Sequence, residues 1–352
     1  MLSVSGENKM SRTGIVRSDI FLEHDPGAWH PESPKRLEII HDSLDTASFP
    51  GLRILTPRPA TREEITLVHG AGHYHKMAET AGKTQCYLDA DTQTSAGSFD
   101  AALAAAGGLI QLVGEVLKGE LDNGFALIRP PGHHAEVDRA MGFCLFNNIA
   151  IAAAWALEMH GLSRIMIVDW DLHHGNGTQR AFYDDPRVLY LSTHLFPFYP
   201  GSGGLSETGV GEGKGYTINL PMGPKHGDQD FVAIFQKIVK PLINQYKPEL
   251  ILVSAGFDTH AADPMGGMMV SPEGFAAMTY ILKSSAEEVC QGRLVLTLEG
   301  GYDLHGQADS VCKVLEALTE TGPAGRELAS CEFAEPEVVG QVRKIFRDQW
   351  GL

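Results

Sequence analysis

The chain has 352 residues, of which 43% are hydrophobic and 20% charged, so it is long enough to bury a large core and is not disordered as a whole. Its 44 acidic and 28 basic residues give a formal net charge of −16, which opposes direct nucleic-acid binding but is compatible with cationic ligands such as lysine-rich peptides or polyamines. The longest largely apolar runs, at 149–157 and 250–255, stop short of the roughly 18 residues that a bilayer span requires, so we expect no transmembrane helix.

The segment at 1–14 holds no apolar stretch long enough for the core of a signal peptide, which predicts a cytoplasmic protein. After it, short runs rich in β-branched residues alternate with helical stretches, a pattern typical of an α/β protein with a mostly parallel sheet. The predicted strands are Gly14–Phe21, Arg53–Thr56, Gly124–Ile128, Arg164–Asp169, Val188–Thr193, Tyr216–Leu220, Leu250–Ala255 and Leu294–Leu298. The predicted helices include Phe99–Leu117, Asn147–His160, Phe231–Tyr246 and Pro272–Cys290, and a capping box at 61–64 predicts a shorter one.

No linker rich in Pro, Gly and Ser divides the chain, and it shows no internal repeat. The glycine-rich segment at 201–215 lies between two predicted strands, where it is expected to form a surface loop. We therefore predict a single domain over residues 12–320, followed by a C-terminal helical extension over 321–352.

The cysteines and histidines indicate which kinds of disulfide, metal-binding or proton-transfer chemistry to expect. The 5 cysteines are widely spaced and form no CxxC pair, so neither a disulfide framework nor a thiolate zinc knuckle is indicated. The 15 histidines are unusual, because several lie beside aspartate and glycine in short clusters. Such clusters are where metal binding or proton transfer is expected.

Polar clusters follow four of the predicted strands. In an open parallel sheet, ligands bind at the carboxyl ends of the strands, so these clusters mark the expected site. They are Arg129–His134, Asp169–Gly177, Ala255–His260 and Glu299–Tyr302.

Asp171 and His173 form half of a metal site. They lie two residues apart after a hydrophobic run, so in extended backbone their side chains face the same side. Asp258 follows another strand-like run and can supply a third ligand, which leaves one position open for water, as a catalytic zinc needs. Any single Asp-x-His pattern is more often a turn or cap, but four polar clusters at four strand ends favour a site.

Two aspartates cancel the formal charge of such a zinc, so we expect it to need help from neighbouring groups. The adjacent His133 and His134 can provide a general base, and Asp169 and Asn176 are candidates to orient the two imidazoles. Tyr302 can place a phenol against a developing oxyanion.

Five motifs carry a family resemblance: PPGHH, DWDLHHGNGTQ, SAGFD, DPMGGMMVS and LEGGY. In this order they resemble the zinc-dependent histone deacetylase superfamily. The asparagine in HHGNGTQ, together with LEGGY, resembles its class II branch and the bacterial histone deacetylase-like amidohydrolases, which are related to acetylpolyamine amidohydrolases. The resemblance runs from His30 to at least Tyr302. It implies an arginase-like fold, with an eight-stranded, mostly parallel sheet flanked by helices and a narrow tunnel to the metal.

The resemblance implies a metal site with defined ligands. Asp171, His173 and Asp258 match the ligands of one zinc ion per chain. A structural potassium ion is also usual in the family, and Asp169, Asp171, His173 and Ser192 align with its inner site.

The resemblance also assigns roles in catalysis. His134, paired with Asn176, matches the general base and acid, and His133, paired with Asp169, matches a more buried histidine. Tyr302 matches the tyrosine that polarises the substrate carbonyl, so the resemblance implies an active enzyme. The implied reaction is hydrolysis of an N-acyl amide to an amine and acetate.

Other residues match the substrate tunnel. Gly142 and Phe143 match one wall, and Tyr199 stands where the opposite wall is usually phenylalanine. Gly301 is expected to contact the substrate beside Tyr302. The segment at 196–198 is interpreted as ordinary loop packing rather than as a substrate contact.

Three further residues bear on the substrate. Arg36 matches a residue of an internal cavity for acetate release, and Asp91 aligns with a rim aspartate that grips the substrate backbone. Met265 occupies the segment where polyamine-specific relatives place a glutamate, so acetyl-lysine in peptides or proteins is the favoured substrate. Acetylpolyamines and small acylated amines remain the alternative. Hydroxamates are expected to inhibit, and a homo-oligomer is compatible with the sequence.

Two other classes of function are disfavoured. Dinuclear ureohydrolases share the fold but need extra carboxylates where this chain has Gly175 and His260. A non-catalytic acyl-lysine binder is disfavoured because Tyr302 and both adjacent histidines are present.

Overall fold

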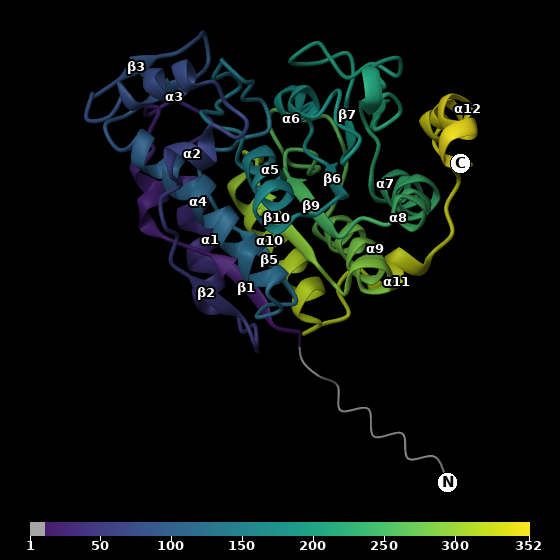
Figure 1. The fold of residues 1–352 in the computed structure, drawn as a ribbon. Coiled ribbons are helices and arrows are strands. Elements are labelled where there is room, and N and C mark those ends of the chain that lie inside the picture. Colours follow the sequence, from purple (N-terminus) through teal and green to yellow (C-terminus); the bar gives the residue numbers. More distant parts are fainter. Residues whose placement is uncertain (1–10) are drawn as a thin grey trace.

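The computed structural model describes residues 11–352, and an eight-stranded sheet forms its centre (Figure 1). Residues 1–10, on which much of the expectation about N-terminal targeting rests, lie outside the described part. Every pair of neighbouring strands is parallel. In spatial order the strands are β2 (Arg53–Leu55), β1 (Thr13–Val16), β5 (Asn123–Ala126), β10 (Leu294–Leu298), β9 (Leu250–Ala255), β6 (Ile165–Asp169), β7 (Val188–Leu195) and β8 (Thr217–Met222).

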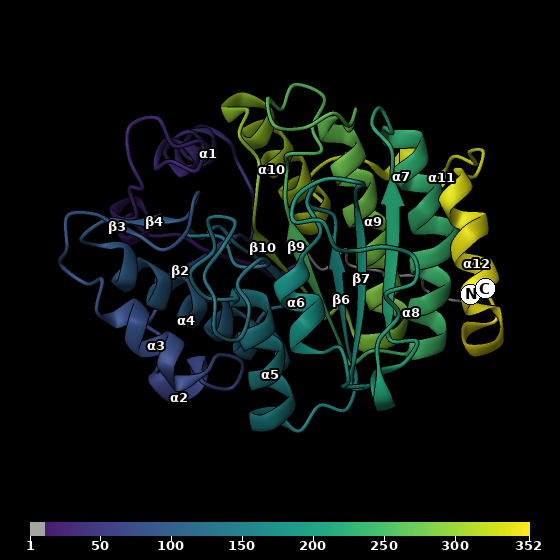
Figure 2. The same ribbon diagram turned by 90° about the horizontal axis from the view of Figure 1, so that it is seen from above.

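Helices cover both faces of this sheet, as Figure 2 shows from above. One face carries α4 (Ser98–Leu117), α5 (Asn148–His160) and α6 (Asn176–Ala181). The other carries α1 (Lys35–Thr46), α10 (Leu304–Thr319), α9 (Pro272–Cys290), α7 (Asp228–Ile234) and α8 (Lys240–Tyr246). Smaller elements are α2 (Arg62–Ile65), α3 (Ala71–Ala78), α11 (Arg326–Ser330) and the antiparallel pair β3 (Cys86–Tyr87) and β4 (Gln93–Thr94).

The local sequence explains where the helices begin and end. The Asn147 side chain accepts the backbone N–H of Ala150 and so caps the start of α5. That helix ends at Gly161, whose φ of 64° lies in the left-handed region that glycine adopts at low cost. The expected capping box is also present, because Thr61 and Glu64 each accept the other's backbone N–H.

Most predicted elements differ from the structure by two residues or fewer at their ends, and two differ more. The first strand ends at Val16 and does not reach Phe21, because Ser18 caps a 3₁₀ helix over Asp19–Glu23. That turn points the Phe21 ring into the core. The predicted helix over Phe231–Tyr246 begins earlier, at Asp228, and contains a π-helical stretch over Phe235–Val239 between α7 and α8.

The C-terminal segment contains α12 (Glu337–Trp350), which packs beside the edge strand β8. The indole N–H of Trp350 donates to the carbonyl of Gly215 at 2.8 Å, and its ring meets Tyr216 edge to face. The predicted boundary between a domain over 12–320 and an extension over 321–352 stays a prediction.

One described helix, α4, is long and apolar enough to cross a membrane by length and composition. However, 72% of its apolar window is buried, and it packs against α5, β1 and β5. The core helix of a globular domain has the same length and composition, and α4 occupies such a core position. All 5 cysteines are free, as expected.

The order of the strands matters for the site. The four polar clusters follow β5, β6, β9 and β10, and these four strands are direct neighbours in the order β5-β10-β9-β6. Because the strands are parallel, their carboxyl ends lie at one edge of the sheet. Clusters that are far apart in the chain therefore meet at that edge.

Candidate active site

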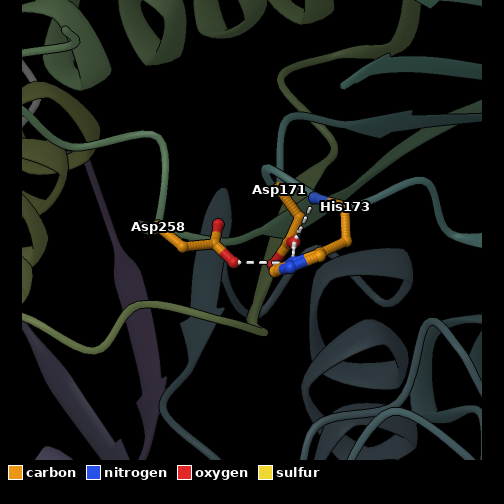
Figure 3. Close-up of side chains that lie close together, drawn as sticks. All are labelled: Asp171, His173 and Asp258. Carbon is orange, nitrogen blue, oxygen red and sulfur yellow. Dashed lines mark hydrogen bonds and ion pairs between the residues drawn. The ribbon is translucent and has the colours of Figure 1, made fainter. Parts of the chain in front are cut away.

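Asp171, His173 and Asp258 converge at this edge, as Figure 3 shows. Nδ1 of His173 lies 3.1 Å from Oδ1 of Asp171 and 3.0 Å from Oδ2 of Asp258. All three residues are buried, and their candidate ligand atoms lie within 4.8 Å of one another. The structure thus brings together the three ligands expected from the sequence.

The backbone holds both carboxylates in place. Oδ2 of Asp171 accepts the N–H of Gly300 at 2.8 Å, and Oδ1 of Asp258 accepts the N–H of Leu172 at 2.8 Å. A Cβ at Gly300 would overlap the Asp258 carboxylate, so this glycine allows the close approach of the backbone. Backbone hydrogen bonds therefore hold both carboxylates in position.

This donor set fits a divalent metal. Contacts of about 3 Å between donor atoms are close to the ~3.3 Å edge of a tetrahedron with ~2 Å bonds. Burial opposes a charge on His173, but hydrogen bonds to Asp171 and Asp258 outweigh it and raise the pKa of His173 to about 10. The cluster thus attracts positive charge, which a divalent cation would supply in place of the proton.

The two adjacent histidines have different partners. Nδ1 of His133 donates to Oδ2 of Asp169 at 3.1 Å, whereas Nδ1 of His134 lies 2.8 Å from Oδ1 of Asn176. Both pairings match the sequence expectation. Burial would lower the pKa of His133, but the Asp171 and Asp169 carboxylates raise it to about 10. Burial and the neighbouring His133 instead lower the pKa of His134, so a neutral base and a cationic imidazole lie side by side.

Arg36 lies over the ring of Tyr302. Its guanidinium lies 5.0 Å from the centre of the Tyr302 ring and donates to the carbonyl oxygens of Gly301 and Glu299 at 2.6 and 2.5 Å. Burial raises the pKa of the Tyr302 phenol well above its ordinary value, although Arg36 opposes this shift. The phenol therefore stays protonated and can donate a hydrogen bond.

A cavity of about 180 Å³ leads to this cluster. It is mostly apolar, with the polar groups of the site among its walls. The lining residues are Asp91, Pro131, His133, His134, Gly142, Phe143, Cys144, His173, Phe198, Tyr199, Met265, Gly300 and Tyr302. Five residues expected to contact substrate are in this set, but Arg36 and Gly301 are not; these two are hydrogen-bonded to each other.

Comparison with known proteins identifies the family. The histone deacetylase domain matches residues 30–318. This chain belongs to the histone deacetylase family. The probable deacetylase of Archaeoglobus fulgidus is 43% identical over 297 residues, which cover 84% of this chain and 82% of that protein. The crystal structure of the HDA15 HD domain is similar with a TM-score of 0.88 and 37% identity, covering 97% of this chain and 96% of that one.

Longer relatives carry the same domain. Histone deacetylase 5 of Arabidopsis thaliana is 39% identical over 332 residues, which cover 89% of this chain and 50% of that protein. Polyamine deacetylase HDAC10 of Homo sapiens is 41% identical over 322 residues, which cover 86% of this chain and 47% of that protein. This chain therefore spans about half the length of these two relatives. The predicted family, fold and class of hydrolytic deacetylase are confirmed.

One wall of the cavity corrects the sequence interpretation. Phe198 was expected to be ordinary loop packing, but its ring stacks on His173 with centroids 5.5 Å apart and lines the cavity. The neighbouring Tyr199 meets His134 edge to face at 5.1 Å. Two aromatic rings from one loop therefore cover two imidazoles of the site. The contact joins segments more than 20 residues apart, so no local pattern reveals it.

The opposite wall depends on an unusual turn. Gly142 and Phe143 both have positive φ, at 56° and 69°, and the N–H of Phe143 donates to the Thr92 hydroxyl at 3.1 Å. A Cβ at Gly142 would overlap the His134 ring. Glycine is thus needed to bring the Phe143 turn against the histidine.

Two glutamates near the site were not assigned roles from the sequence. Oε1 of Glu136 accepts Nδ2 of Asn176 at 3.0 Å, which fixes the side-chain amide behind His134. Oε2 of Glu299 accepts the N–H of Gly132 at 2.7 Å, and burial raises the pKa of Glu299 to about 7. Glu299 directly follows a strand and belongs to a polar cluster, so the sequence could have indicated a role in the site. Glu136 lies in a loop, where no sequence pattern indicates such a role.

A buried charge network anchors the loop before α1. Glu32 accepts Arg129 in two hydrogen bonds and Nη1 of Arg36 at 3.0 Å, and it contacts Nε2 of His24 at 3.2 Å. Burial alone would raise the pKa of Glu32, but Arg129 and His24 hold it well below its ordinary value. Through Glu32, the network connects Arg129, which follows β5, with Arg36, which lies over the Tyr302 ring.

The structure also explains why a dinuclear ureohydrolase site is disfavoured. A Cβ at Gly175 would overlap the Asp169 carboxylate, so the backbone leaves no room for a third acidic side chain there. His260 packs near Gly306, and its Nδ1 accepts the N–H of Ala262 at 3.1 Å. Within residues 11–352, the only cluster of His, Cys, Asp and Glu with metal-binding geometry is the triad described above.

Proposed function

We propose that this chain is a zinc-dependent deacetylase that acts on acetyl-lysine side chains. The observation that carries the proposal is the buried triad of Asp171, His173 and Asp258, of which His173 lines an apolar cavity together with His134. Two carboxylates and one imidazole suit zinc or ferrous iron, and zinc is our first choice. Such an ion would supply a Lewis acid that polarises the acyl oxygen and lowers the pKa of water.

His134 is proposed to move the protons. Its Nδ1–H donates to Asn176, so Nε2 carries the lone pair and can remove a proton from the attacking water. The protonated imidazole then gives this proton to the amide nitrogen as the carbon–nitrogen bond breaks. The products are a free amine and acetate.

Tyr302 and His133 are proposed to stabilise charge. The phenol of Tyr302 donates a hydrogen bond to the oxygen of the tetrahedral species as negative charge develops on it. His133, paired with Asp169, places a positive charge beside His134. Phe143, Phe198 and Tyr199 exclude water from the acyl group.

Acetyl-lysine is favoured by the composition of the cavity walls. The walls include Met265 and three aromatic side chains, which suit the methylene stem of lysine. A second candidate substrate is an acetylated polyamine, because Asp91 lines the cavity and a relative is a polyamine deacetylase. We retain small acylated amines in this second class.

A structural potassium ion is part of the proposal. Asp169 and Ser192 are register partners on β6 and β7, so their oxygen atoms lie on adjacent strands. Oxygen ligands suit a hard cation of this kind. Asp171 and His173 follow in the same loop and complete the segment proposed to surround it.

The test compares turnover of an acetyl-lysine peptide with that of N-acetylputrescine, before and after chelation and zinc replacement. We expect faster turnover of the peptide, its loss with a chelator and its recovery with zinc. Faster turnover of N-acetylputrescine would assign the second substrate class. Turnover that persists after complete metal removal would contradict the metal-dependent mechanism.

A further inference from the structure

Trp29 is the most exposed large hydrophobic side chain in the described part of the chain, with 98% of its surface accessible. It lies between the 3₁₀ helix Asp19–Glu23 and α1, in the loop that also carries His30. Tryptophan has a large apolar surface and is enriched where proteins bind other chains. An indole left in water beside an active site therefore points to a ligand.

A groove of about 510 Å³ lies beside this tryptophan. One side is the loop at 26–31, and the other is the β3–β4 hairpin with Gln85, Ala90 and Gln93. Asp91 and Phe143 line both this groove and the catalytic cavity. The groove is thus continuous with the mouth of the cavity, where the part of a substrate outside the cavity must lie.

His30 fixes the loop to this mouth. Its Nε2–H donates to the carbonyl of Asp91 at 3.0 Å, and its Nδ1 accepts the N–H of Glu32 at 3.2 Å. Its ring also meets Phe143 edge to face, with centroids 4.6 Å apart. Trp29 is therefore attached to a backbone that is anchored to the catalytic cavity.

The charge of the groove selects its occupant. Its lining residues include the acidic residue Asp91 and no lysine or arginine. Asp25 lies in the same turn as the loop, since its Oδ1 accepts the N–H of Gly27 at 3.1 Å. An aromatic face with acidic neighbours attracts a cation.

We propose that this groove is a subsite for a lysine or arginine side chain that flanks the acetyl-lysine of a peptide, with its cation over the Trp29 indole. The proposal rests on the proposed function and makes it more specific. A peptide branches at the α-carbon of the acetyl-lysine, so one arm can turn sideways at Asp91 into the groove. A linear acetylpolyamine has no such branch, and its chain leaves the cavity along the cavity axis.

The experiment measures kcat/KM for two acetyl-lysine peptides of equal length, one with arginine and one with glutamate at the positions that flank the acetyl-lysine. A capped single acetyl-lysine serves as the minimal substrate. The variants are Trp29→Ala, Trp29→Leu, which keeps apolar surface but lacks the π system, and Met159→Ala, which removes an exposed apolar side chain at the end of α5. The oligomeric state of each variant is measured by sedimentation.

We expect wild type to prefer the arginine peptide, and both Trp29 variants to lower its kcat/KM by about two- to fivefold. The minimal substrate and the Met159→Ala variant should be unaffected, and added salt should reduce the preference. Equal turnover of the two peptides by wild type would overturn the subsite while leaving the proposed function intact. A change in oligomeric state of Trp29→Ala would also overturn it, because the indole would then cover a second copy. No turnover of either peptide or of the minimal substrate by zinc-loaded wild type would refute the proposed function itself.

Discussion

Oδ1 of Asn176 lies 2.8 Å from Nδ1 of His134. The opposite end of that amide donates to Glu136, and a carboxylate can only accept, so Glu136 dictates which end of Asn176 faces the histidine. Asn176 in turn holds the proton on Nδ1 and leaves Nε2 free. The reactivity of His134 thus depends on a glutamate that does not line the cavity.

We predict that Glu136→Ala lowers kcat about tenfold with little change in KM, because the amide loses a charged hydrogen-bond partner. Glu136→Gln should retain most activity, since its side-chain oxygen can still accept. The cost of Glu136→Ala should nearly vanish in the Asn176→Ala background, because both act on one imidazole. Steady-state kinetics of wild type, Glu136→Ala, Asn176→Ala and the double variant measure this coupling, and additive losses would contradict it.

Removing one carboxylate from the triad should abolish metal binding. In Asp258→Ala, His173 and Asp171 remain, but two ligands hold zinc far more weakly than three. We expect metal analysis to show about one zinc per chain in wild type and almost none in the variant, with loss of turnover. The exposed Asp42→Ala serves as the control. Full occupancy and activity in Asp258→Ala would refute the ligand assignment.

Tyr302→Phe tests the phenol as an oxyanion donor. Loss of one such donor typically costs about 10²–10³ in turnover, and we expect this loss without a change in zinc content. Trifluoroacetyl substrates should be affected less than acetyl substrates, since their carbonyl is already electron-poor. Turnover of both substrates is compared at equal zinc loading. Equal losses for the two would indicate that Tyr302 only packs beside the site.

Linear hydroxamates should inhibit strongly. Their two oxygen atoms chelate divalent metals, and Phe143 and Phe198 both line the cavity that a methylene chain would enter. Because Phe198 stacks on His173, Phe198→Ala should raise the inhibition constant about tenfold by removing apolar contact. Inhibition constants for one hydroxamate on both proteins provide the measurement. An unchanged constant would show that this wall does not contact the inhibitor.

Glu32 should make stability depend on pH. Its pKa is lowered in the folded state, so its contribution is fully present above the unfolded-state pKa of about 4.3 and is lost as pH falls. Glu32→Ala leaves Arg129 and Arg36 without their buried partner and should cost about 3–5 kcal/mol. Asp45→Ala, which breaks an exposed pair with Arg17, should cost less than about 1 kcal/mol.

Denaturant unfolding of these variants at pH 7 and at about pH 3, which lies clearly below the unfolded-state pKa of Glu32, tests both statements. The difference between wild type and Glu32→Ala should shrink at the lower pH. A constant difference would mean that Glu32 stabilises the fold by packing rather than by charge.

The sequence by itself determined the sheet and the metal triad. Strands β9 and β10 have the predicted bounds, because short β-branched runs between turn residues are a local signal. The polar clusters that follow four strands could be recognised in the sequence because the ends of those strands were predicted. Parallel strands align their carboxyl ends, so a rule about fold class was enough to place Asp171 and Asp258 near one another.

Only the tertiary structure decided what surrounds that triad. Phe198 lines the catalytic cavity, Glu136 accepts a hydrogen bond from Asn176, and Trp29 lines the neighbouring groove. Each of these placements brings together segments that are distant in the chain. Such contacts depend on how loops pack over the sheet, and loops carry no periodic pattern that fixes the direction of a side chain. Local periodicity therefore predicts which strand a residue follows. Long-range packing determines which atoms its side chain contacts.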